Sequence, residues 1–580
     1  MFNPYHRATL LFFGALLLGM TASTANADTI YVCWDGSGDY LTIQEGIDAA
    51  ADGDELVVCD GTYTGPGNKD LDFGGKAITV RSENGPESCI IDCEHDGRGF
   101  HFHSGETAAS VTDGLTIRNG YVHADSPGLA RGAGIYCSGS SPTITNCLIA
   151  GNLADDIPVY SHGGGVYVSS STPTITGCRF TSNTATYGGG LHCQHSAGLT
   201  ISDCTFLGNM ATWGGAVCCH YSDILVANCI MAGNSAYYCG AGLQCVECRL
   251  TVDNCTISGN VAGRHGDPVG GGGGVHVTTD SSEITNCTIL ANTAPKGGGV
   301  FGSGGNTRMS NCIIAENEAE NYGGGAFWAD GSPTIIACIF AGNAADRGGG
   351  IRSAGANPTV INCQMAYNTA LDGGGMHLND SGGSIINCTI AHNSAINGRA
   401  LACDSDQDPS QVAMANCILW NGASEVWNND ESTITITYSD VYGGWSGDGN
   451  IAMDPLFIDF HHGDFHLSNG SPCIDAGDNA ALPLDIFTDI EGNARFIDDP
   501  ATDDTGNGEP PVVDMGAYEF QACPGDLSGD CCVDRTDLYI LLAWFGVGSG
   551  GDLDCDGDTD HADLGILLAH WGEGCPQGRV

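Results

Sequence analysis

The sequence is poor in positive charge. Lys and Arg together number 18 against 69 Asp plus Glu, and the formal net charge is −51. Such a surface repels nucleic acids and anionic membranes and attracts divalent cations, so neither DNA nor RNA is an expected partner. After Asp28 the chain also lacks any stretch of about 20 apolar residues, so no transmembrane span is expected.

Motifs that mark common enzyme classes are missing too. There is no Ser-His-Asp motif, no phosphate-binding loop and no HExxH. The His residues show no metal-ligand spacing, and nothing in the Cys pattern selects for a soft metal. Motifs alone therefore assign no catalytic centre.

The first residues are typical of a secretory signal peptide. His6 and Arg7 precede an apolar run from Leu10 to Met20, and a small-residue cleavage site ends at Ala27. We therefore expect residues 1–27 to be a signal peptide and the mature protein to be extracellular or at the cell surface. Export permits disulfide formation, and the chain has 29 Cys.

A Cys-Asn-Gly register repeats through the middle of the chain from about residue 130. Cysteines recur, mostly in steps of 25 or 26 residues, at Cys147, Cys178, Cys204, Cys229, Cys255, Cys287, Cys312, Cys338, Cys363, Cys388 and Cys417. Five residues after each of the first ten stands an Asn, at Asn152, Asn183, Asn209, Asn234, Asn260, Asn292, Asn317, Asn343, Asn368 and Asn393. Glycine clusters follow, as at residues 188–190, 297–299, 348–350 and 373–375. This three-part pattern establishes an internal repeat.

Each repeat consists of short β-branched strands separated by turn residues, and no helix fits the pattern. Cys147 and Ile149 share one side of a strand and Ile144 takes the other, so all three point inward only if the chain bends near Asn146. A repeated bend with a period of about 25 residues predicts a parallel β-helix. We expect Asn amides to bond between coils and the Cys ladder to be buried packing rather than disulfides.

The repeats resemble those of polymorphic outer-membrane proteins and of the wider pectin-lyase-like superfamily. The similarity covers roughly residues 28–440 and lies in elements such as Gly214-Gly215-Ala216-Val217, Phe180/Asn183, Phe206/Asn209 and Phe340/Asn343. The resemblance implies an all-β, right-handed parallel β-helix solenoid, and it leaves the activity open.

Both ends of the array are expected to be closed. A capping box at Thr42-Ile43-Gln44-Glu45 predicts one helix over the first coil, within an N-terminal cap at residues 28–65, and Leu56-Val57-Val58 is expected to start the first strand. Segments such as Asp514-Met515-Gly516-Ala517-Tyr518-Glu519 resemble the terminal module called a choice-of-anchor domain. This resemblance implies a closing cap at residues 441–522 near a surface-attachment region.

Two loops near the C-terminus have oxygen side chains at loop positions 1, 3, 5, 9 and 12, and position 7 offers its backbone carbonyl. Hard oxygen ligands at this spacing predict Ca²⁺ as a cofactor, and an apolar helix is expected after each loop, at residues 538–545 and 564–571. The ligands of the first loop would be Asp526, Ser528, Asp530, Cys532, Asp534 and Asp537. Those of the second would be Asp552, Asp554, Asp556, Asp558, Asp560 and Asp563.

The paired loops resemble a type I dockerin, with two EF-hand-like calcium sites, over about residues 523–575, and we assign residues 523–580 to this dockerin-like domain. The resemblance implies a cohesin-like protein partner. Cys531 stands where the second loop has Gly557, which weakens the first expected site. A disulfide between Cys523 and Cys575 would suit a small exported domain, and Cys555 with Cys531 or Cys532 is a second pairing.

Stacking turns sequence columns into surface stripes. The residues before the glycine clusters include Tyr187, Trp213 and Tyr322, and the alternate position after them includes His192, His276, Phe301 and Phe327. Aromatic faces stack on pyranose rings and polar groups bond to sugar hydroxyls, so these residues are candidates for a polysaccharide-binding groove. The alternative is that outward strand positions favour aromatic residues for packing alone.

Four residues are candidates for catalysis. They are Lys296, Asp346, Arg347 and Asp372, which fall within a few coils of one another. Together they could form a cluster of basic and acidic groups similar to that of polysaccharide lyases with this fold. The alternative is that each is an ordinary corner residue. If the protein is an enzyme, we expect a polysaccharide lyase or a glycoside hydrolase.

The leading hypothesis is an extracellular or cell-surface protein whose β-helix binds, and in one version degrades, polysaccharide while the dockerin-like module docks it to a partner. The rival is a non-enzymatic adhesin or structural surface protein, which the regular repeat and the missing catalytic motif favour.

Overall fold

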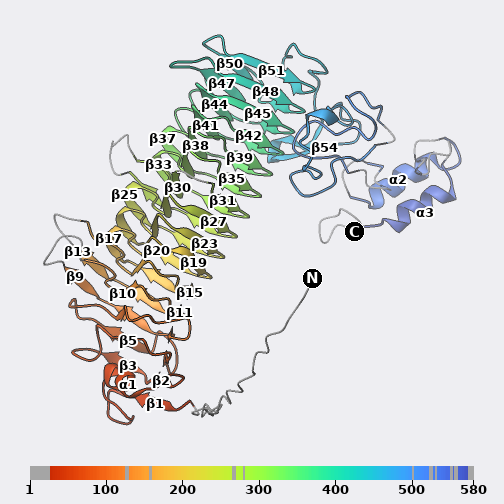
Figure 1. Ribbon diagram of the computed structural model, residues 1–580. Helices are drawn as coiled ribbons and strands as arrows, with labels where there is room; N and C mark the ends of the chain where they lie inside the picture. The colour runs from red at the N-terminus through yellow and green to blue at the C-terminus, as the bar shows by residue number, and fades with distance from the viewer. Residues whose placement is uncertain are drawn as a thin grey trace, which may run out of the picture.

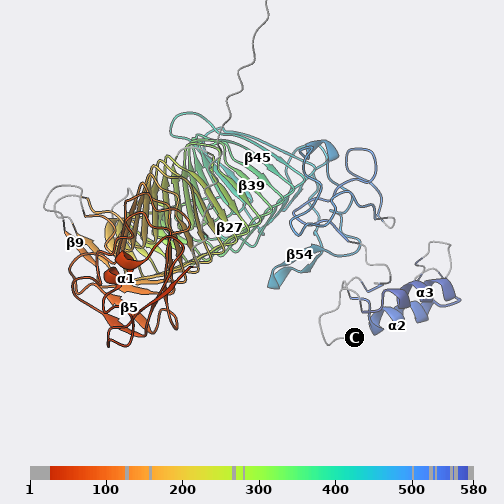
Figure 2. The same cartoon turned by 60° about the horizontal axis from the view of Figure 1, so that its bottom comes forward.

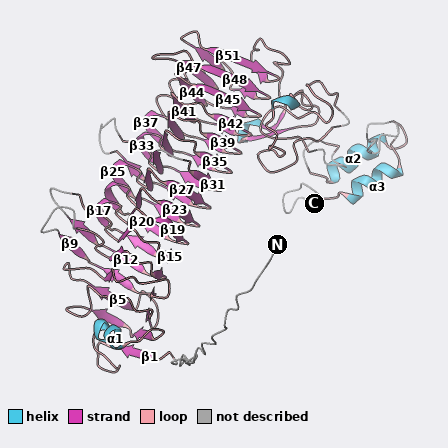
Figure 3. Cartoon of the chain, viewed as in Figure 1, coloured by secondary structure: helices cyan, strands magenta, loops and turns pink. Residues whose placement is uncertain are grey.

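The computed structural model is a long solenoid of stacked coils, followed by a smaller non-repetitive unit and two helices (Figure 1). Strands form nearly all of the solenoid, and helices lie only near its first coil and toward the C-terminus (Figure 3). The structure describes residues 27–123, 130–155, 160–263, 270–278, 281–499, 502–521, 525, 527–528, 532–548, 551, 553 and 559–572. The expected signal peptide lies, except for Ala27, outside these ranges.

Each coil passes through up to four parallel sheets, which we number in the order in which a coil visits them. Sheet 1 has 16 strands: β1 (Thr29–Val32), β2 (Glu55–Val58), β4 (Thr79–Ser82), β7 (Val111–Asp113), β11 (Thr143–Thr145), β15 (Thr174–Thr176), β19 (Ala197–Ser202), β23 (Asp223–Ala227), β27 (Arg249–Asp253), β31 (Glu283–Thr285), β35 (Arg308–Ser310), β39 (Thr334–Ile336), β42 (Thr359–Ile361), β45 (Gly382–Ile386), β48 (Gln411–Ala415) and β51 (Thr433–Thr437). Sheet 2 has 15 strands: β3 (Gly61–Tyr63), β5 (Cys89–Asp92), β8 (Thr116–Arg118), β12 (Leu148–Ala150), β16 (Arg179–Thr181), β20 (Thr205–Leu207), β24 (Ile230–Ala232), β28 (Thr256–Ser258), β32 (Thr288–Leu290), β36 (Ile313–Ala315), β40 (Ile339–Ala341), β43 (Gln364–Ala366), β46 (Thr389–Ala391), β49 (Ile418–Trp420) and β52 (Asp440–Val441).

The other two sheets close the coil. Sheet 3 is shorter and has 8 strands: β9 (Tyr121–His123), β13 (Leu153–Asp155), β17 (Thr184–Tyr187), β21 (Met210–Trp213), β25 (Ser235–Cys239), β29 (Val261–Ala262), β33 (Thr293–Lys296) and β37 (Glu318–Tyr322). Sheet 4 has 13 strands: β6 (Phe100–Phe102), β10 (Ile135–Ser138), β14 (Val166–Ser169), β18 (Leu191–Gln194), β22 (Val217–His220), β26 (Leu243–Val246), β30 (Val275–Thr278), β34 (Val300–Ser303), β38 (Ala326–Ala329), β41 (Ile351–Ala354), β44 (Met376–Asn379), β47 (Leu401–Asp404) and β50 (Val426–Asn428). Figure 2 shows these coils stacked side by side along the solenoid.

The bend predicted at Asn146 is present. Asn146 has a φ of 51°, and the equivalent residues of the next coils, among them Gly177, Asp203 and Asn254, share this left-handed conformation. Asn, Asp and Gly tolerate it best, which explains their recurrence before the ladder cysteine. The bend lets residues of sheets 1 and 2 point into one core, where Ile144, Cys147 and Ile149 are all buried.

The asparagine ladder also forms as predicted. Asn183 is fully buried, and its Nδ2 donates to Ile149 O at 2.9 Å and to Asn209 Oδ1 at 3.0 Å. The pattern repeats from Asn152 to Asn393, and it ends where Asn421 Nδ2 donates to Glu425 Oε2 at 2.7 Å. Each buried amide therefore has partners in the coils beside it.

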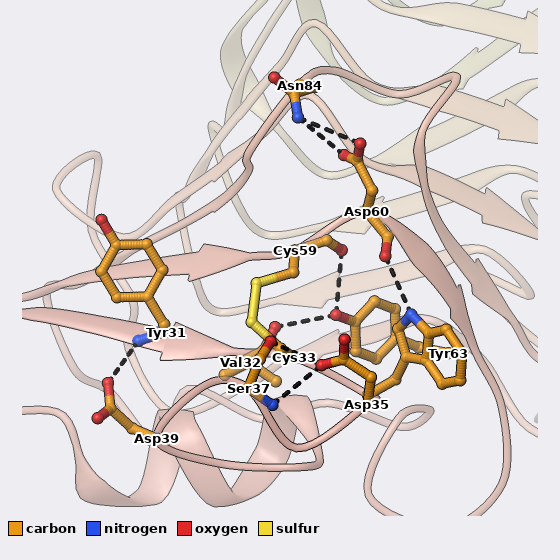
Figure 4. The surroundings of a disulfide bond; sticks show 11 residues. Tyr31, Val32, Cys33, Asp35, Ser37, Asp39, Cys59, Asp60, Tyr63 and Asn84 are labelled. Atoms are coloured by element: carbon orange, nitrogen blue, oxygen red, sulfur yellow. Dashed lines mark hydrogen bonds between the residues drawn. A yellow bond between two sulfur atoms is a disulfide. The ribbon is translucent and has the colours of Figure 1, made fainter.

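The ladder cysteines are free and buried, which confirms the prediction of packing rather than cross-linking. One disulfide that the sequence analysis missed joins Cys33 to Cys59 at the first coil (Figure 4). Beside it, the Tyr63 hydroxyl lies 2.9 Å from Val32 O and 3.0 Å from Cys59 O. The bond links the ends of β1 and β2, where no earlier coil covers the stack.

The predicted capping helix is α1 (Ile43–Ala49), with Thr42 as N-cap and a capping box to Glu45. Ile43 and Ile47 are buried against the first coil. The expectation that Leu56-Val57-Val58 starts the first strand is wrong, because β1 (Thr29–Val32) precedes the helix and pairs with β2 in parallel. In chain order the helix therefore follows the first strand of sheet 1 and precedes the second, rather than preceding both.

The unit after the last coil contains one antiparallel pair, β53 (Phe457–Asp459) and β54 (Asp464–Leu467), and two short 3-10 helices, Phe460–His462 and Asn479–Ala481. It packs on the outside of sheet 2, where Tyr518 contacts Ala366 and Ala391 and its hydroxyl donates to Gln364 Oε1 at 2.6 Å. Residues 441–521 therefore cover the side of the last coils.

Two α-helices follow, α2 (Arg535–Trp544) and α3 (His561–Ala569). Val533, Leu541 and Leu567 form a small buried core between them. Both helices were predicted, but each begins three residues earlier than expected because Asp534 and Asp560 serve as N-caps. None of the helices in the described ranges has the length and apolar character needed to cross a bilayer.

Candidate functional site

Two columns of side chains run along the solenoid where sheet 3 turns into sheet 4. The corner column holds the residue before each glycine cluster, and it pairs Tyr187 with Trp213, Lys296 with Tyr322, Tyr322 with Arg347 and Arg347 with Asp372. The face column holds one outward residue from each sheet 4 strand between β10 and β44: Tyr136, Tyr167, His192, Cys218, Gln244, His276, Phe301, Phe327, Arg352 and His377. The coil-to-coil register is the one that the repeat predicted.

The glycine clusters explain why the two columns lie close together. Gly188 has a φ of 63°, and a Cβ on it would collide with the Leu191 carbonyl oxygen. Only glycine permits so tight a turn. The turn brings Tyr187, before it, to within 5.8 Å of His192, after it, measured between ring centroids.

Aromatic rings form an accessible row in the N-terminal half of the corner column. Tyr187 stacks on Trp213 with centroids 4.8 Å apart, and Trp213 stacks on Tyr238 at 5.1 Å. Tyr160 is 53% exposed and lies 5.6 Å from the Tyr187 ring. Tyr187 and Trp213 are themselves partly exposed. Ring faces in a row on a surface are suited to stacking on sugar rings.

The face column is largely covered. His192, His276 and Phe327 are buried although they point away from the core, and Phe301 is partly exposed. Corner-column rings lie over this column, as where Tyr322 is 6.0 Å from Phe327. The expectation of an open stripe at His192, His276 and Phe327 is therefore wrong, because strand parity determines direction but not what lies above.

Charged residues gather in the C-terminal half of the two columns. Buried Arg352 donates from Nη1 to His377 Nδ1 at 3.0 Å, and His377 Nε2 lies 3.5 Å from Asp404 Oδ1. Arg347 lies 3.5 Å from Asp372 and 3.6 Å from Asp404. Because Arg352 donates to Nδ1, the proton of neutral His377 sits on Nε2, facing Asp404.

Burial and neighbouring groups determine the charges in this cluster. Burial lowers the pKa of His377, so its ring is neutral at neutral pH. Burial would raise the pKa of Asp404, but His377, Asn379 and Arg352 together lower it to about 2. We therefore take Asp404 as an ionised carboxylate, with the Arg347 guanidinium 3.6 Å away and the neutral His377 ring 3.5 Å away.

The four predicted catalytic candidates are only partly brought together. Arg347 and Asp372 pair, and Lys296 Nζ lies 5.8 Å from the centroid of the Tyr322 ring. Asp346 is exposed, and its backbone carbonyl accepts the N–H groups of the neighbouring coil. The pairing therefore supports a site around Arg347, without Asp346.

Sequence reasoning missed the part of this cluster supplied by Arg352, His377 and Asp404. Arg352 and His377 belong to the face column, and Asp404 is the register partner of Asn379 on the next coil. The aligned columns contained Arg352 and His377. Asp404 belongs to the column two residues further along the strand, and its closeness to His377 becomes visible only once the register between coils is known.

Two groups in the described part of the chain could hold a metal ion. His192, Cys218 and His220 each bring one ligand atom within 4.8 Å of the others, and so do the carboxylates of Asp475, Asp498 and Asp504. Burial lowers the pKa of both His192 and His220 and raises that of Cys218, so the imidazoles are neutral. The sequence analysis saw no metal-ligand spacing in the histidines, because one of the three ligands comes from another coil.

The predicted calcium ligands are described only in part. Asp526, Asp530, Asp552, Asp554, Asp556 and Asp558, and both cysteines of the expected Cys523–Cys575 pair, lie outside the described residues. Ser528, Cys532, Asp534, Asp537, Asp560 and Asp563 lie within them.

Asp537 and Asp563 occupy equivalent places in the two loops. Both are fully buried at the third position of a helix, and their Oδ2 atoms accept from Asp534 N at 2.7 Å and Asp560 N at 2.6 Å. Their Oδ1 atoms accept from Ser528 N and Leu553 N, at the start of each loop. Each carboxylate thus closes its loop onto its helix. Cys532 is disulfide-bonded.

A separate cleft of about 490 Å³ lies between sheet 2 and the unit that covers it. Its lining comes from Asn311, Ile339 and Asn362 on the coils and from residues 485–492 of the covering unit. Asp489, one of the acidic residues in this lining segment, already accepts the backbone N–H groups of Glu491 and Asn493. The cleft is a seam between two packed units, and we assign no chemistry to it.

Comparison with known proteins identifies the fold. The sequence profile described as "Right handed beta helix region" matches residues 67–289 and 241–452, which together span more than half of the chain. The chain belongs to the right-handed β-helix family. A search of curated protein sequences found no match.

Solved structures that match this β-helix include polysaccharide-active enzymes. They are pectate lyase Pel9A (13% identity, 86% of this chain and 98% of that chain covered, TM-score 0.26), a mannuronic acid specific family 6 lyase from human gut microbiota (13%, 74% and 92%, 0.33) and the A-module of the Azotobacter vinelandii mannuronan C-5 epimerase AlgE6 (12%, 67% and 94%, 0.29). At these identities and scores they carry no argument about residues or activity.

Proposed function

We propose that this β-helix binds polysaccharide along the corner column, outside the cell. One observation carries the proposal: the stacked, partly exposed rings of Tyr187 and Trp213 lie on the same column that continues into Lys296 and Arg347, and the exposed Tyr160 ring lies beside Tyr187. Sugar rings stack on the aromatic faces, while hydroxyl or acidic groups of the chain reach the charged half.

The charged half favours glycans that carry anionic groups. The chain has a net charge of −51 and only 18 Lys plus Arg, yet four of these cations lie over aromatic rings of the two columns: Arg98, Arg131, Lys296 and Arg352. Arg98, Arg131 and Lys296 are partly exposed, so the two columns offer positive groups on an otherwise acidic protein. A bidentate guanidinium suits a carboxylate or sulfate better than a hydroxyl.

Retention of the protein on immobilised polysaccharide tests the binding surface. Trp213→Ala and Tyr187→Ala should each weaken retention by about 5- to 30-fold, since loss of one stacking ring costs about 1–2 kcal/mol. Tyr221→Ala is the matched control, because Tyr221 is 53% exposed but lies outside the corner column. Equal retention of all four proteins would refute binding along this column.

Whether the surface also cleaves its glycan depends on the Arg352, His377 and Asp404 cluster. We propose that, if cleavage occurs, it occurs there, as a polysaccharide lyase or glycoside hydrolase reaction. Screening uronans, sulfated glycans and neutral glycans with Ca²⁺ for unsaturated products and new reducing ends provides the assay. Product formation that Asp404→Asn abolishes would support catalysis at this cluster.

The second candidate is a non-enzymatic adhesin. The regular Asn and Cys ladders favour it, because their repeated residues serve hydrogen bonding and packing between coils. Retention without any product from every glycan in the screen would establish this alternative over the enzyme.

We further propose that residues 523–580 form a Ca²⁺-dependent, dockerin-like docking module for a cohesin-like partner. The equivalent, fully buried placement of Asp537 and Asp563 at position 12 of two loops supports it. Calorimetry should show that Asp537→Ala and Asp563→Ala each remove one Ca²⁺ site, while the exposed-residue control Asp485→Ala removes none. Unchanged stoichiometry in both loop variants would contradict the assignment.

A further inference from the structure

We propose that His192, Cys218 and His220 form a binding site for a borderline-soft transition-metal ion such as Zn²⁺. His192 Nε2 lies 3.0 Å from His220 Nδ1, and Cys218 Sγ lies 3.8 Å from the same nitrogen. Imidazole nitrogen and thiolate sulfur are ligands that Zn²⁺ and Cu²⁺ prefer over oxygen. The proposal does not depend on polysaccharide binding.

Strand geometry builds this site without any loop. Side chains alternate along a strand, so Cys218 and His220, two residues apart on β22, project from the same outer face. Parallel pairing places His192 of β18 directly beside Cys218. Two ligands from one strand and one from its neighbour thus converge on a single point.

The observed separations are close to those of an occupied site. In a tetrahedral Zn²⁺ site with Zn–N of about 2.05 Å and Zn–S of about 2.3 Å, two nitrogens lie about 3.4 Å apart and nitrogen and sulfur about 3.6 Å apart. The distances of 3.0 Å and 3.8 Å differ from these by a few tenths of an ångström, within the reach of small side-chain rotations. Gln244 Oε1, 3.5 Å from Cys218 Sγ, supplies an oxygen for the fourth position.

The surroundings favour a buried metal–thiolate pair. His192 and Cys218 are buried, and the Tyr187 ring covers the group, with centroids 5.8 Å from His192 and 5.4 Å from His220. Exclusion of water strengthens the attraction between a cation and a thiolate. His220 is only partly buried and leaves a path by which an ion can enter.

Neighbouring thiols do not belong to the site. Cys193 and Cys219 occupy the inner faces of β18 and β22, and their sulfur atoms are 2.7 Å apart in the core. Strand parity therefore separates one outward thiol, Cys218, from the ladder of inward ones.

Titration of the chelator-treated full-length chain with Co²⁺ and then Zn²⁺ tests the site. Thiolate ligation should produce a near-ultraviolet charge-transfer band that saturates at one equivalent of Co²⁺ and disappears as Zn²⁺ displaces it. Cys218→Ser should abolish the band, and His220→Gln should weaken Zn²⁺ affinity by about 100-fold or more. Since His220 is partly exposed, its variant retains the test if Cys218→Ser fails to fold.

Two matched controls separate this site from other thiols and histidines. Cys219→Ala removes the adjacent inward thiol, and His195→Gln removes an exposed histidine three residues from His192. Both should retain the band and the wild-type Zn²⁺ affinity. No band in the wild type, a band that persists in Cys218→Ser, or unchanged affinity in His220→Gln would overturn the proposal.

Discussion

Asn260 and Asn254 lie six residues apart in one repeat and have different structural roles. Asn260 is fully buried, and its Nδ2 donates to Met231 O and Asn292 Oδ1, both at 2.9 Å. Its Oδ1 accepts from N and Nδ2 of Asn234 at 3.0 and 2.9 Å. Asn254 is exposed and holds a φ of 51° at the corner, and its Nδ2 donates to Asn228 Oδ1 at the surface at 2.8 Å. Residue type therefore repeats for two separate physical reasons.

Asn260→Ala should lower the free energy of unfolding by about 2–4 kcal/mol, because it leaves Met231 O and Asn234 N buried without partners. Urea denaturation of the two proteins measures the difference. Asn254→Gly is the matched control, and it should change stability by less than about 0.5 kcal/mol since glycine accepts the same φ. Equal effects of the two substitutions would disprove the assigned roles.

At the scale of an element, the unit that covers sheet 2 contains a buried cluster of ionisable side chains. Arg495 and Glu519 are both fully buried and pair at 3.1 Å. Asp514 is also buried beside them, and its backbone N–H donates to Glu519 Oε2 at 3.2 Å. One arginine cannot neutralise two carboxylates, and burial raises the pKa of Asp514 to about 7 and that of Glu519 well above its usual range.

This unit should lose stability as pH rises. The pKa of Asp514 is about 7 in the folded protein and about 3.9 in the unfolded chain, so between these values the folded state binds more protons. Stability is therefore greatest near the lower value, and we expect a loss of about 2 kcal/mol between pH 5 and pH 7. Hydrogen exchange of peptides from residues 502–521, corrected for intrinsic rate and recorded with a chelator present, measures it.

The matched variant for this pH effect is Asp514→Asn, which cannot ionise. It should be less stable at pH 5, because it loses an acceptor for Phe520 N, but its exchange should vary little with pH. A wild-type slope of the opposite sign would show that Asp514 is ionised in the folded state.

At the scale of the molecule, stability comes from coils stacked on coils. The core runs the whole length of the solenoid and includes the ladder cysteines, whose thiols donate to backbone carbonyls, as from Cys204 Sγ to Ser202 O at 3.1 Å. Covalent cross-linking is confined, among the described coils, to Cys33 and Cys59 at the N-terminal end. The solenoid is thus held by burial and hydrogen bonds.

Thiol alkylation tests this picture. Without reductant, the eleven ladder cysteines should be protected in the native protein and alkylated in denaturant, as peptide mass spectrometry would record. Cys33 and Cys59 should be alkylated only after reduction, which makes them an internal control. Ladder cysteines that need reduction before they react would contradict the packing role.

Much of the fold was predictable because each repeat imposes the same local requirements on backbone conformation, hydrogen bonding and side-chain direction. The residue at each corner must adopt positive φ, the buried Asn must find partners one coil away, and each inward Cys or Ile must follow strand parity. These constraints act on single residues at a fixed spacing, so aligned columns expose them. The disulfide at Cys33 and β1 escaped notice because both occur once, outside the register.

The sequence by itself determined the parallel β-helix, its register, the capping helix and the two C-terminal helices, since each depends on local pattern and spacing. Only the tertiary structure decided which outward residues are accessible, and that Arg352, His377 and Asp404 meet. It alone joined His192 to Cys218 and His220. These groupings depend on how a tight glycine turn lays one column over another, and distances between side chains on different coils are not encoded in any single repeat.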